Sequence, residues 1–160
     1  MGVDVDTGRA RLPGELVASS TFLLKRLGSA AKQRAMAVYE QAGLGPYHHA
    51  ILIVLDEGAP ETQGSIADAL GYDRGTLVGL LDELEEQGLV ERKRDPADRR
   101  RHVVRMTAKG KQTLERLRAL ARQLEDDFLA PLDPDQRAAL HDLLLQLAAE
   151  HEPGVARPRV

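Results

Sequence analysis

The strongest constraint on the fold lies in residues 62–107, where the spacing of apolar residues changes from that of a helix to that of a strand. The pattern over residues 62–70 predicts a short helix that ends at Gly71, a residue type that enters the left-handed conformation without steric cost. Asp73 stands two residues later, where it can cap a second helix that runs to Gln87. Two short helices joined by so tight a turn predict a helix-turn-helix.

A β-hairpin is predicted directly after these two helices. The segments LVERKR and HVVRMT read as short strands, and Asp95-Pro96-Ala97-Asp98 between them places Asp and Pro at the first two positions of a turn. A helix-turn-helix followed by a hairpin is a winged helix. Its second helix fits the major groove of DNA, about 12 Å wide, and its wing reaches phosphates or the adjacent minor groove.

Charge is distributed unevenly along the chain, whose net charge is −3. Residues 56–86 hold nine acidic residues and one arginine, whereas residues 91–111 hold nine basic and three acidic residues. The run RKRDPADRRRHVV alone, residues 92–104, holds six arginines and lysines. A chain that is acidic overall but locally basic can present one site to a polyanion, although a solvated loop is the alternative. We expect the acidic run at 82–86 to be a solvated face that tilts away from DNA.

Several classes of protein are disfavoured by what the sequence lacks. The chain has no cysteine, so thiolate metal sites and thiol sensing are excluded and a cytoplasmic location is expected. No apolar run approaches the roughly 20 residues that cross a bilayer, so we expect no association with a membrane. No nucleophile motif or glycine-rich phosphate loop is recognisable, and we therefore expect no cofactor, no metal and no enzymatic activity.

Helices are predicted on both sides of the winged helix, one over residues 14–42, one over 46–57 and two after Thr107. Because only five residues are Phe or Tyr and none is Trp, the core must be aliphatic, and the expected fold class is mainly α with a small β-wing. The leucine stripes of the first helix and the last two exceed what a wing-sized lobe can cover, which indicates a dimer. The predicted parts are a disordered N-terminal arm (1–12), an N-terminal dimerisation helix (13–45), a winged helix-turn-helix lobe (46–107), C-terminal dimerisation helices (108–150) and a disordered tail (151–160).

The segment GSIADALGYDRGTLV, residues 64–78, followed by LLDELEEQGLVERKRDPADRRRHVVRMTAKG, resembles the MarR family of bacterial regulators over about residues 47–115. The resemblance implies a homodimeric repressor of its own or a nearby promoter, bound to a pseudo-palindromic double-stranded operator and released by a small-molecule effector. Its two recognition helices would lie about 34 Å apart, or a multiple of that distance. Two other classes stay open: a winged helix that binds another protein, and an enzyme that uses His48 or His49.

In the family's wing, an aspartate is followed after one residue by an arginine, and this pattern falls on Asp98 and Arg100. The resemblance implies that Arg100 enters the minor groove while Asp98 holds it, and residues two apart in an extended strand do face the same side. The alternative is that Asp98 only stabilises the turn. Of the other wing cations, two or three are expected to contact phosphates and the rest to stay solvated. These cations are Arg92, Lys93, Arg94, Arg99 and Arg101, with Arg94, Arg99 and Arg101 as the candidates.

The second helix of the pair turns two glycines toward the groove. A buried stripe of Leu77, Leu81 and Leu84 leaves Gly75, Gly79, Asp82 and Glu86 on the opposite side. The glycines let the backbone approach the bases closely, so that flanking side chains reach base edges and a thymine methyl; alternatively, they are simply tolerated on an exposed face. The DNA-binding candidates of the two helices are Gln63, Ser65, Arg74, Gly75, Thr76, Val78 and Gly79.

Tyr47, His48 and His49 begin the predicted helix at residue 46, near where members of the family bind effectors, and the resemblance makes them candidates for a ligand site. Adjacent residues of a helix point about 100° apart, which is poor geometry for holding one metal ion. The alternative for each histidine is a structural or surface role.

Overall fold

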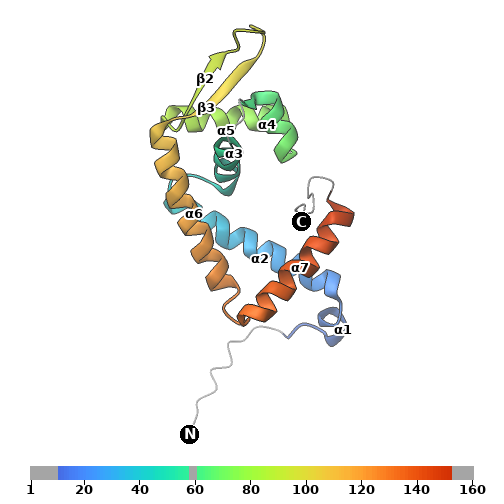
Figure 1. The fold of residues 1–160 in the computed structure, drawn as a ribbon. Coiled ribbons are helices and arrows are strands. Elements are labelled where there is room, and N and C mark those ends of the chain that lie inside the picture. Colours follow the sequence, from blue (N-terminus) through green and yellow to red (C-terminus); the bar gives the residue numbers. More distant parts are fainter. Residues whose placement is uncertain (1–10, 58–60, 153–160) are drawn as a thin grey trace. The chain divides into compact units, whose positions relative to one another are not determined.

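The structure, a computed structural model, describes residues 11–57 and 61–152, so most of the predicted N-terminal arm and C-terminal tail lies outside it. The described chain is mainly helical with a small β-wing, as predicted (Figure 1). Its elements are α1 (Gly14–Val17), α2 (Ser20–Gln41), α3 (Pro46–Asp56), β1 (Glu61–Thr62), α4 (Gln63–Leu70), α5 (Arg74–Glu86), β2 (Val90–Arg94), β3 (His102–Met106), α6 (Ala108–Phe128) and α7 (Pro134–His151).

The prediction of one continuous helix over residues 14–42 is wrong. The chain leaves the helix after Val17 and begins α2 at Ser20. Ser19 causes the break, because its Oγ accepts the Phe22 N–H at 3.3 Å and its carbonyl accepts the next N–H, as an N-cap does. Residues 11–34 belong to a unit separate from the rest of the chain, and none of them is buried.

The second unit, from Ala35 onward, contains the winged helix and an aliphatic core. The predicted stripe of α5, Leu77, Leu81 and Leu84, is at most 1% exposed. These side chains pack with residues from α3, α4, α6 and the sheet, including Ile51, Ile66, Leu89, Val104, Leu114 and Leu117.

The turn of the helix-turn-helix follows its predicted chemistry. Gly71 ends α4 with φ +65°, a conformation that glycine adopts without steric cost. Asp73 caps α5, since its Oδ1 accepts the Thr76 N–H at 2.9 Å. The backbone between the two helices is therefore fixed at both ends, which sets the direction in which α5 leaves the turn.

The wing is the predicted hairpin with one strand more. β2 and β3 pair in antiparallel register from Val90 opposite Met106 to Arg94 opposite His102. The other edge of β3 pairs with β1, with Thr62 opposite Val103. This two-residue strand was not predicted, because two residues are too few to show an alternating pattern. It ties the base of the wing to the start of α4.

A close approach of backbones joins the wing to α6. The Thr107 N–H donates to the Leu89 carbonyl at 3.0 Å, and the Thr107 hydroxyl donates to the Gly88 carbonyl at 2.7 Å. Thr107 also caps α6, since its Oγ1 accepts the Gly110 N–H at 3.0 Å. A Cβ on Gly110 would lie 2.1 Å from the Leu89 oxygen, so only a residue without a side chain fits there.

Candidate nucleic-acid interface

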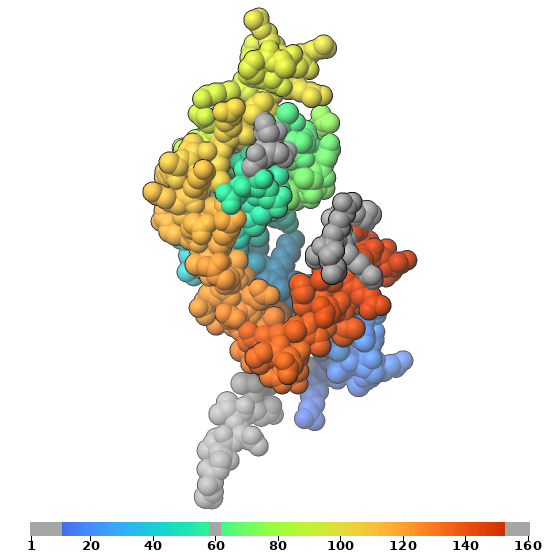
Figure 2. All heavy atoms as spheres, in the orientation of Figure 1, coloured from blue at the N-terminus to red at the C-terminus, as the bar shows by residue number. Residues whose placement is uncertain are grey.

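A groove of about 550 Å³ lies between α5 and the wing, and residues at the start of α4 also line it. The wing projects beyond the lobe in the space-filling view (Figure 2). Five residues of the groove were not among the DNA-binding candidates: Thr62, Gly64, Asp68, Leu77 and His102. The predicted residues that the groove brings together are Gln63, Ser65, Arg74, Val78, Arg100 and Arg101.

The face of α5 opposite its buried stripe is exposed, as predicted. A Cβ on Gly79 would meet no atom within 4 Å, so nothing in the fold requires glycine there. A Cβ on Gly75 would lie 3.3 Å from Oδ1 of Asp73, which is tight. Val78, on the same side of the helix as the groove, is 38% exposed. The backbone of this face is therefore accessible to an incoming partner.

The polar side chains at the two helix starts already have partners. The Thr76 hydroxyl donates to Asp73, and this bond and that from the Thr76 backbone hold the pKa of the Asp73 carboxyl below its ordinary value. The Ser65 hydroxyl accepts the Thr62 N–H at 2.9 Å and donates to the Thr62 carbonyl at 2.9 Å. A contact of Ser65 or Thr76 with DNA must therefore share these hydroxyls with the helix caps.

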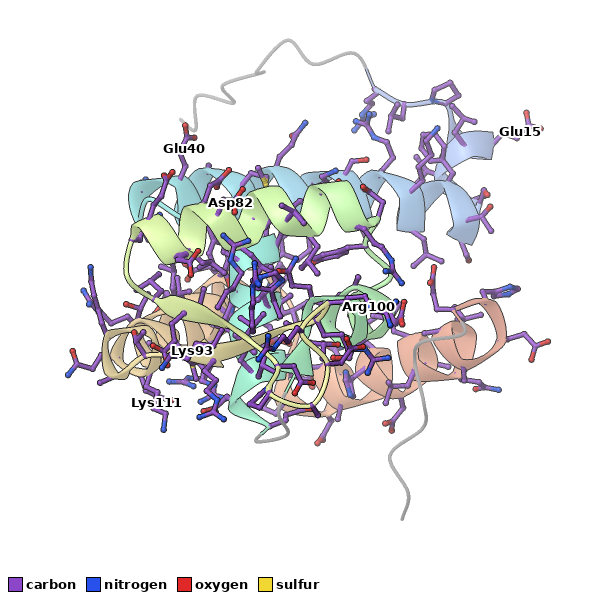
Figure 3. The ribbon with its side chains drawn as sticks, turned by 90° about the horizontal axis from the view of Figure 1, so that it is seen from above. Glu15, Glu40, Asp82, Lys93, Arg100 and Lys111 are labelled. Carbon is purple, nitrogen blue, oxygen red and sulfur yellow. The ribbon has the colours of Figure 1, made fainter. Side chains whose placement is uncertain are left out.

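At the tip of the wing, Asp98 organises the turn and lies close to two guanidinium groups. Its Oδ1 accepts the Arg100 N–H at 3.0 Å, and its carbonyl accepts the Arg101 N–H at 2.9 Å. The two side-chain Nε atoms each lie 3.7 Å from a carboxylate oxygen of Asp98, farther than a hydrogen bond. The Arg100 side chain is 95% exposed (Figure 3), so it is held near Asp98 only loosely.

Arg94 and Arg99 are exposed as well, but they are not among the residues that line the groove.

Arg92 is not a solvated cation of the wing, because carboxylates of the acidic run of α5 bind it. Arg92 Nη2 lies 2.6 Å from Glu85 Oε2 and 2.5 Å from Asp82 Oδ1. Glu83 is paired too, with His48. Asp82, Glu83 and Glu86 are exposed, as expected, but Asp82, Glu83 and Glu85 also have partners that the sequence did not reveal, on the strand that follows α5 and at the start of α3.

The contact between Arg92 and Glu85 also changes how these two side chains titrate. The bonds from the Arg92 side chain and backbone hold the pKa of Glu85 below its ordinary value, and the bond with Glu85 raises the pKa of Arg92. The pair therefore stays charged across the physiological range.

The two histidines each have a structural partner, as the alternative interpretation expected. His48 Nδ1 accepts the Gly45 N–H at 2.9 Å, and its Nε2 lies 2.8 Å from Glu83 Oε2, close enough for an ion pair although off the direction of a hydrogen bond. His49 Nδ1 lies 2.6 Å from the Tyr39 hydroxyl. Burial, and then the positive charge of Arg118, lower the pKa of His49.

The third candidate for a ligand site, Tyr47, is 43% exposed and packs edge-on against Tyr72, with ring centroids 5.6 Å apart. Tyr47, His48 and His49 therefore contact three different partners.

Over residues 11–57 and 61–152, no group of three or more histidine, aspartate or glutamate side chains is arranged to hold a metal ion. The same residues contain no helix that is both long enough and apolar enough to cross a membrane.

A helix that exposes its backbone, a wing with exposed arginines and a groove between them define a winged-helix DNA-binding protein. A sequence profile of the MarR family matches residues 42–101. The chain is 33% identical to a putative transcriptional regulatory protein for the hcr operon of Thauera aromatica. The aligned segment of 135 residues covers 84% of this chain and 81% of the relative.

Two solved structures extend the comparison. A transcriptional repressor, CouR, bound to a 23-mer DNA duplex, matches with a TM-score of 0.77 and 35% identity over 87% of this chain and 99% of the other. CouR from Rhodococcus jostii RHA1, bound to p-coumaroyl-CoA, matches with a TM-score of 0.69 and 28% identity over 85% and 96% of the two chains. The chain belongs to the MarR family. It is a DNA-binding transcriptional regulator and not an enzyme, as the sequence predicted.

Proposed function

We propose that this regulator is a cytoplasmic homodimeric repressor, which binds a pseudo-palindromic operator in its own or a nearby promoter and is released by a small molecule. The observation that carries the operator contact is the groove between α5 and the wing, which places Arg74, Arg100 and Arg101 around one hollow. The sugar-phosphate backbone that separates the major groove of DNA from the minor groove fits such a hollow, because the guanidinium groups can bind its phosphate oxygens from both sides.

Leucines that the chain itself covers only in part support the homodimer. On α7, Leu143, Leu144 and Leu147 are between 40% and 59% exposed, and no residue of this helix is buried. On α2, Leu23, Leu24 and Leu27 are between 38% and 53% exposed. Apolar surface of this extent on capped, regular helices is typical of an interface between protein chains.

The same exposed surfaces support our division of the chain into dimerisation and DNA-binding parts. We assign residues 13–45 and 108–150 to dimerisation and residues 46–107 to DNA binding, as the sequence predicted. In a two-fold dimer the two α5 helices would enter successive major grooves, so the operator should contain two half-sites about 34 Å apart or a multiple of that distance.

The ligand is the least constrained part of the proposal. The related CouR protein is known with p-coumaroyl-CoA, which makes an aromatic acyl thioester a suitable first probe. Tyr47, His48 and His49 stay our candidates for the ligand-responsive region. His48 supports this assignment, because it joins the start of α3 to Glu83 on α5 and a ligand that moves His48 would also move α5.

Selection of duplexes from a random library with the purified full-length chain tests the operator contact. We expect an inverted repeat whose affinity falls steeply with added salt, since each phosphate contact releases counterions. Arg101→Gln should weaken binding, whereas Lys111→Gln, which changes an exposed cation outside the groove, should change it little. No enriched sequence, or binding that salt does not weaken, would contradict the proposal and favour a winged helix that binds another protein.

The dimer and its release are tested separately. Analytical ultracentrifugation of the free chain should give twice the mass of one chain, and the complex with the selected duplex should contain two chains. Addition of p-coumaroyl-CoA to this complex, with coenzyme A alone as the control, tests release by a ligand of this chemistry.

A further inference from the structure

The contact between α5 and the base of the wing carries an inference about how DNA is read. We propose that Arg92 is a positioning residue, which fixes α5 and the wing relative to each other so that both meet the operator in one register. The inference rests on the proposed function, because it concerns the specificity of the same DNA-binding surface.

Arg92 is bound to α5 through its backbone as well as its side chain. The Arg92 N–H donates to Glu85 Oε1 at 3.0 Å, while Nε and Nη2 donate to Glu85 Oε2 at 3.0 and 2.6 Å. Nη2 also donates to Asp82 Oδ1 at 2.5 Å, one turn earlier on the helix. A planar guanidinium with several bonds of this kind fixes an orientation, which apolar packing at the base of the wing does not.

The alternation of the strand explains why Arg92 faces inward while its neighbour does not. Arg92 pairs across the hairpin with Val104, which is 2% exposed, and the Arg92 side chain itself is 19% exposed. Lys93 pairs with Val103, and its side chain, on the other face of the hairpin because successive residues of a strand alternate, is 67% exposed. The Arg92 side chain therefore contacts α5, whereas the Lys93 side chain is accessible to solvent.

The wing acts as a lever on the position of its tip. From Arg92 to the turn at Ala97 the chain advances five residues, which span about 16 Å at about 3.3 Å per residue. A rotation of about 10° at the base of the wing would displace the tip by about 3 Å, which is close to the spacing of one base pair, about 3.4 Å. A loose base would therefore let Arg100 reach more than one step of the DNA, and discrimination between sites would fall.

The acidic partners make the experiment decisive, because simple electrostatics and positioning predict opposite results. Removing a carboxylate near DNA should tighten binding if the carboxylate only repels phosphates. If Glu85 instead holds Arg92, Glu85→Gln should weaken binding to the correct sequence although it removes a negative charge.

Two duplexes are the probes: the site recovered by selection and a shuffled duplex of equal length and composition. We expect Arg92→Lys and Glu85→Gln each to lower affinity for the selected site by about tenfold, and to leave affinity for the shuffled duplex within about twofold. Arg92→Lys keeps the charge but not the planar fork, so a phosphate contact at this position would survive it. Lys93→Gln is the matched control: if it lowers affinity at all, it should do so equally for both duplexes.

The double variant Arg92→Lys/Glu85→Gln should bind no more weakly than either single variant, because both act on one contact. Urea unfolding of each variant establishes that it is folded under the binding conditions. Unchanged discrimination by Arg92→Lys, or tighter binding of the selected site by Glu85→Gln, would overturn the inference. Failure of the wild-type chain to select any sequence would instead overturn the proposed function, so the two failures are distinguishable.

Discussion

Gly110→Ala should destabilise the fold, although alanine normally favours a helix. A Cβ at this position would lie 2.1 Å from the Leu89 carbonyl oxygen and 2.7 Å from Met106 Cγ. Ordinary contact with that oxygen requires α6 to retreat by about 1 Å. This shift also disturbs the hydrogen bonds that Thr107 makes to the carbonyls of Gly88 and Leu89, just before β2.

The magnitude follows from the opposing contributions. Overpacking costs about 1–3 kcal/mol. Weakening two backbone-directed hydrogen bonds costs about 1 kcal/mol each. The higher helix propensity of alanine returns about 1 kcal/mol. The net loss in the free energy of unfolding is therefore about 2–4 kcal/mol, or roughly 6–12 °C in Tm for a chain of this size.

Urea unfolding followed by circular dichroism measures this loss, at one fixed chain concentration because a dimer's stability depends on it. Gly79→Ala is the matched control, because its Cβ would meet no atom within 4 Å and the change should stabilise the chain by about 1 kcal/mol. Ordinary surface substitutions change the free energy of unfolding by up to about 0.5 kcal/mol. If the free energy of unfolding of Gly110→Ala differs from that of the wild type by no more than this, the steric reasoning is refuted.

Three further predictions concern DNA binding and pH. Gly79→Ala should weaken operator binding despite its gain in stability, as measured by fluorescence anisotropy; equal or tighter binding would mean that the glycine is only tolerated. Arg100→Ala should cost more operator affinity than Arg99→Ala or Arg101→Ala, and equal losses would remove the special role of Arg100 in the minor groove. Because burial lowers the pKa of His49 from 6.5, the unfolded chain takes up its proton first as the pH falls. The free energy of unfolding should therefore decrease below about pH 6.5, and less so in His49→Gln; parallel pH profiles would contradict this assignment.

The elements that the sequence predicted well are those with local chemistry. Asp73, Gly71 and the apolar spacing of α5 determine the helix-turn-helix within a few residues of chain, and each behaves in the structure as its type predicts. The break at Ser19 escaped prediction although it too is local. The apolar periodicity continues through it, and a serine on an exposed helix is not by itself a cap signal.

What the sequence could not show depends on contacts between distant residues. The partners of Arg92 are seven and ten residues away, on an element of different periodicity, so its charge suggested a phosphate contact or a solvated side chain. His48 likewise pairs with a carboxylate 35 positions later in the chain. Six residues of the groove were predicted one by one, but their placement around one hollow follows from the packing of α4, α5 and the wing.

One face of α5 holds the helix in the fold and the other is exposed toward DNA. This separation determines how regulators of this kind can diverge and be redesigned. Leu77, Leu81 and Leu84 are held by the core, and Glu85 is held by the wing. The exposed face has no comparable intramolecular contact at Gly79, where an added Cβ would meet no atom within 4 Å. New operator preferences can therefore be engineered at this position without repacking the lobe, because the residues that read the DNA and the residues that keep the helix in place are not the same.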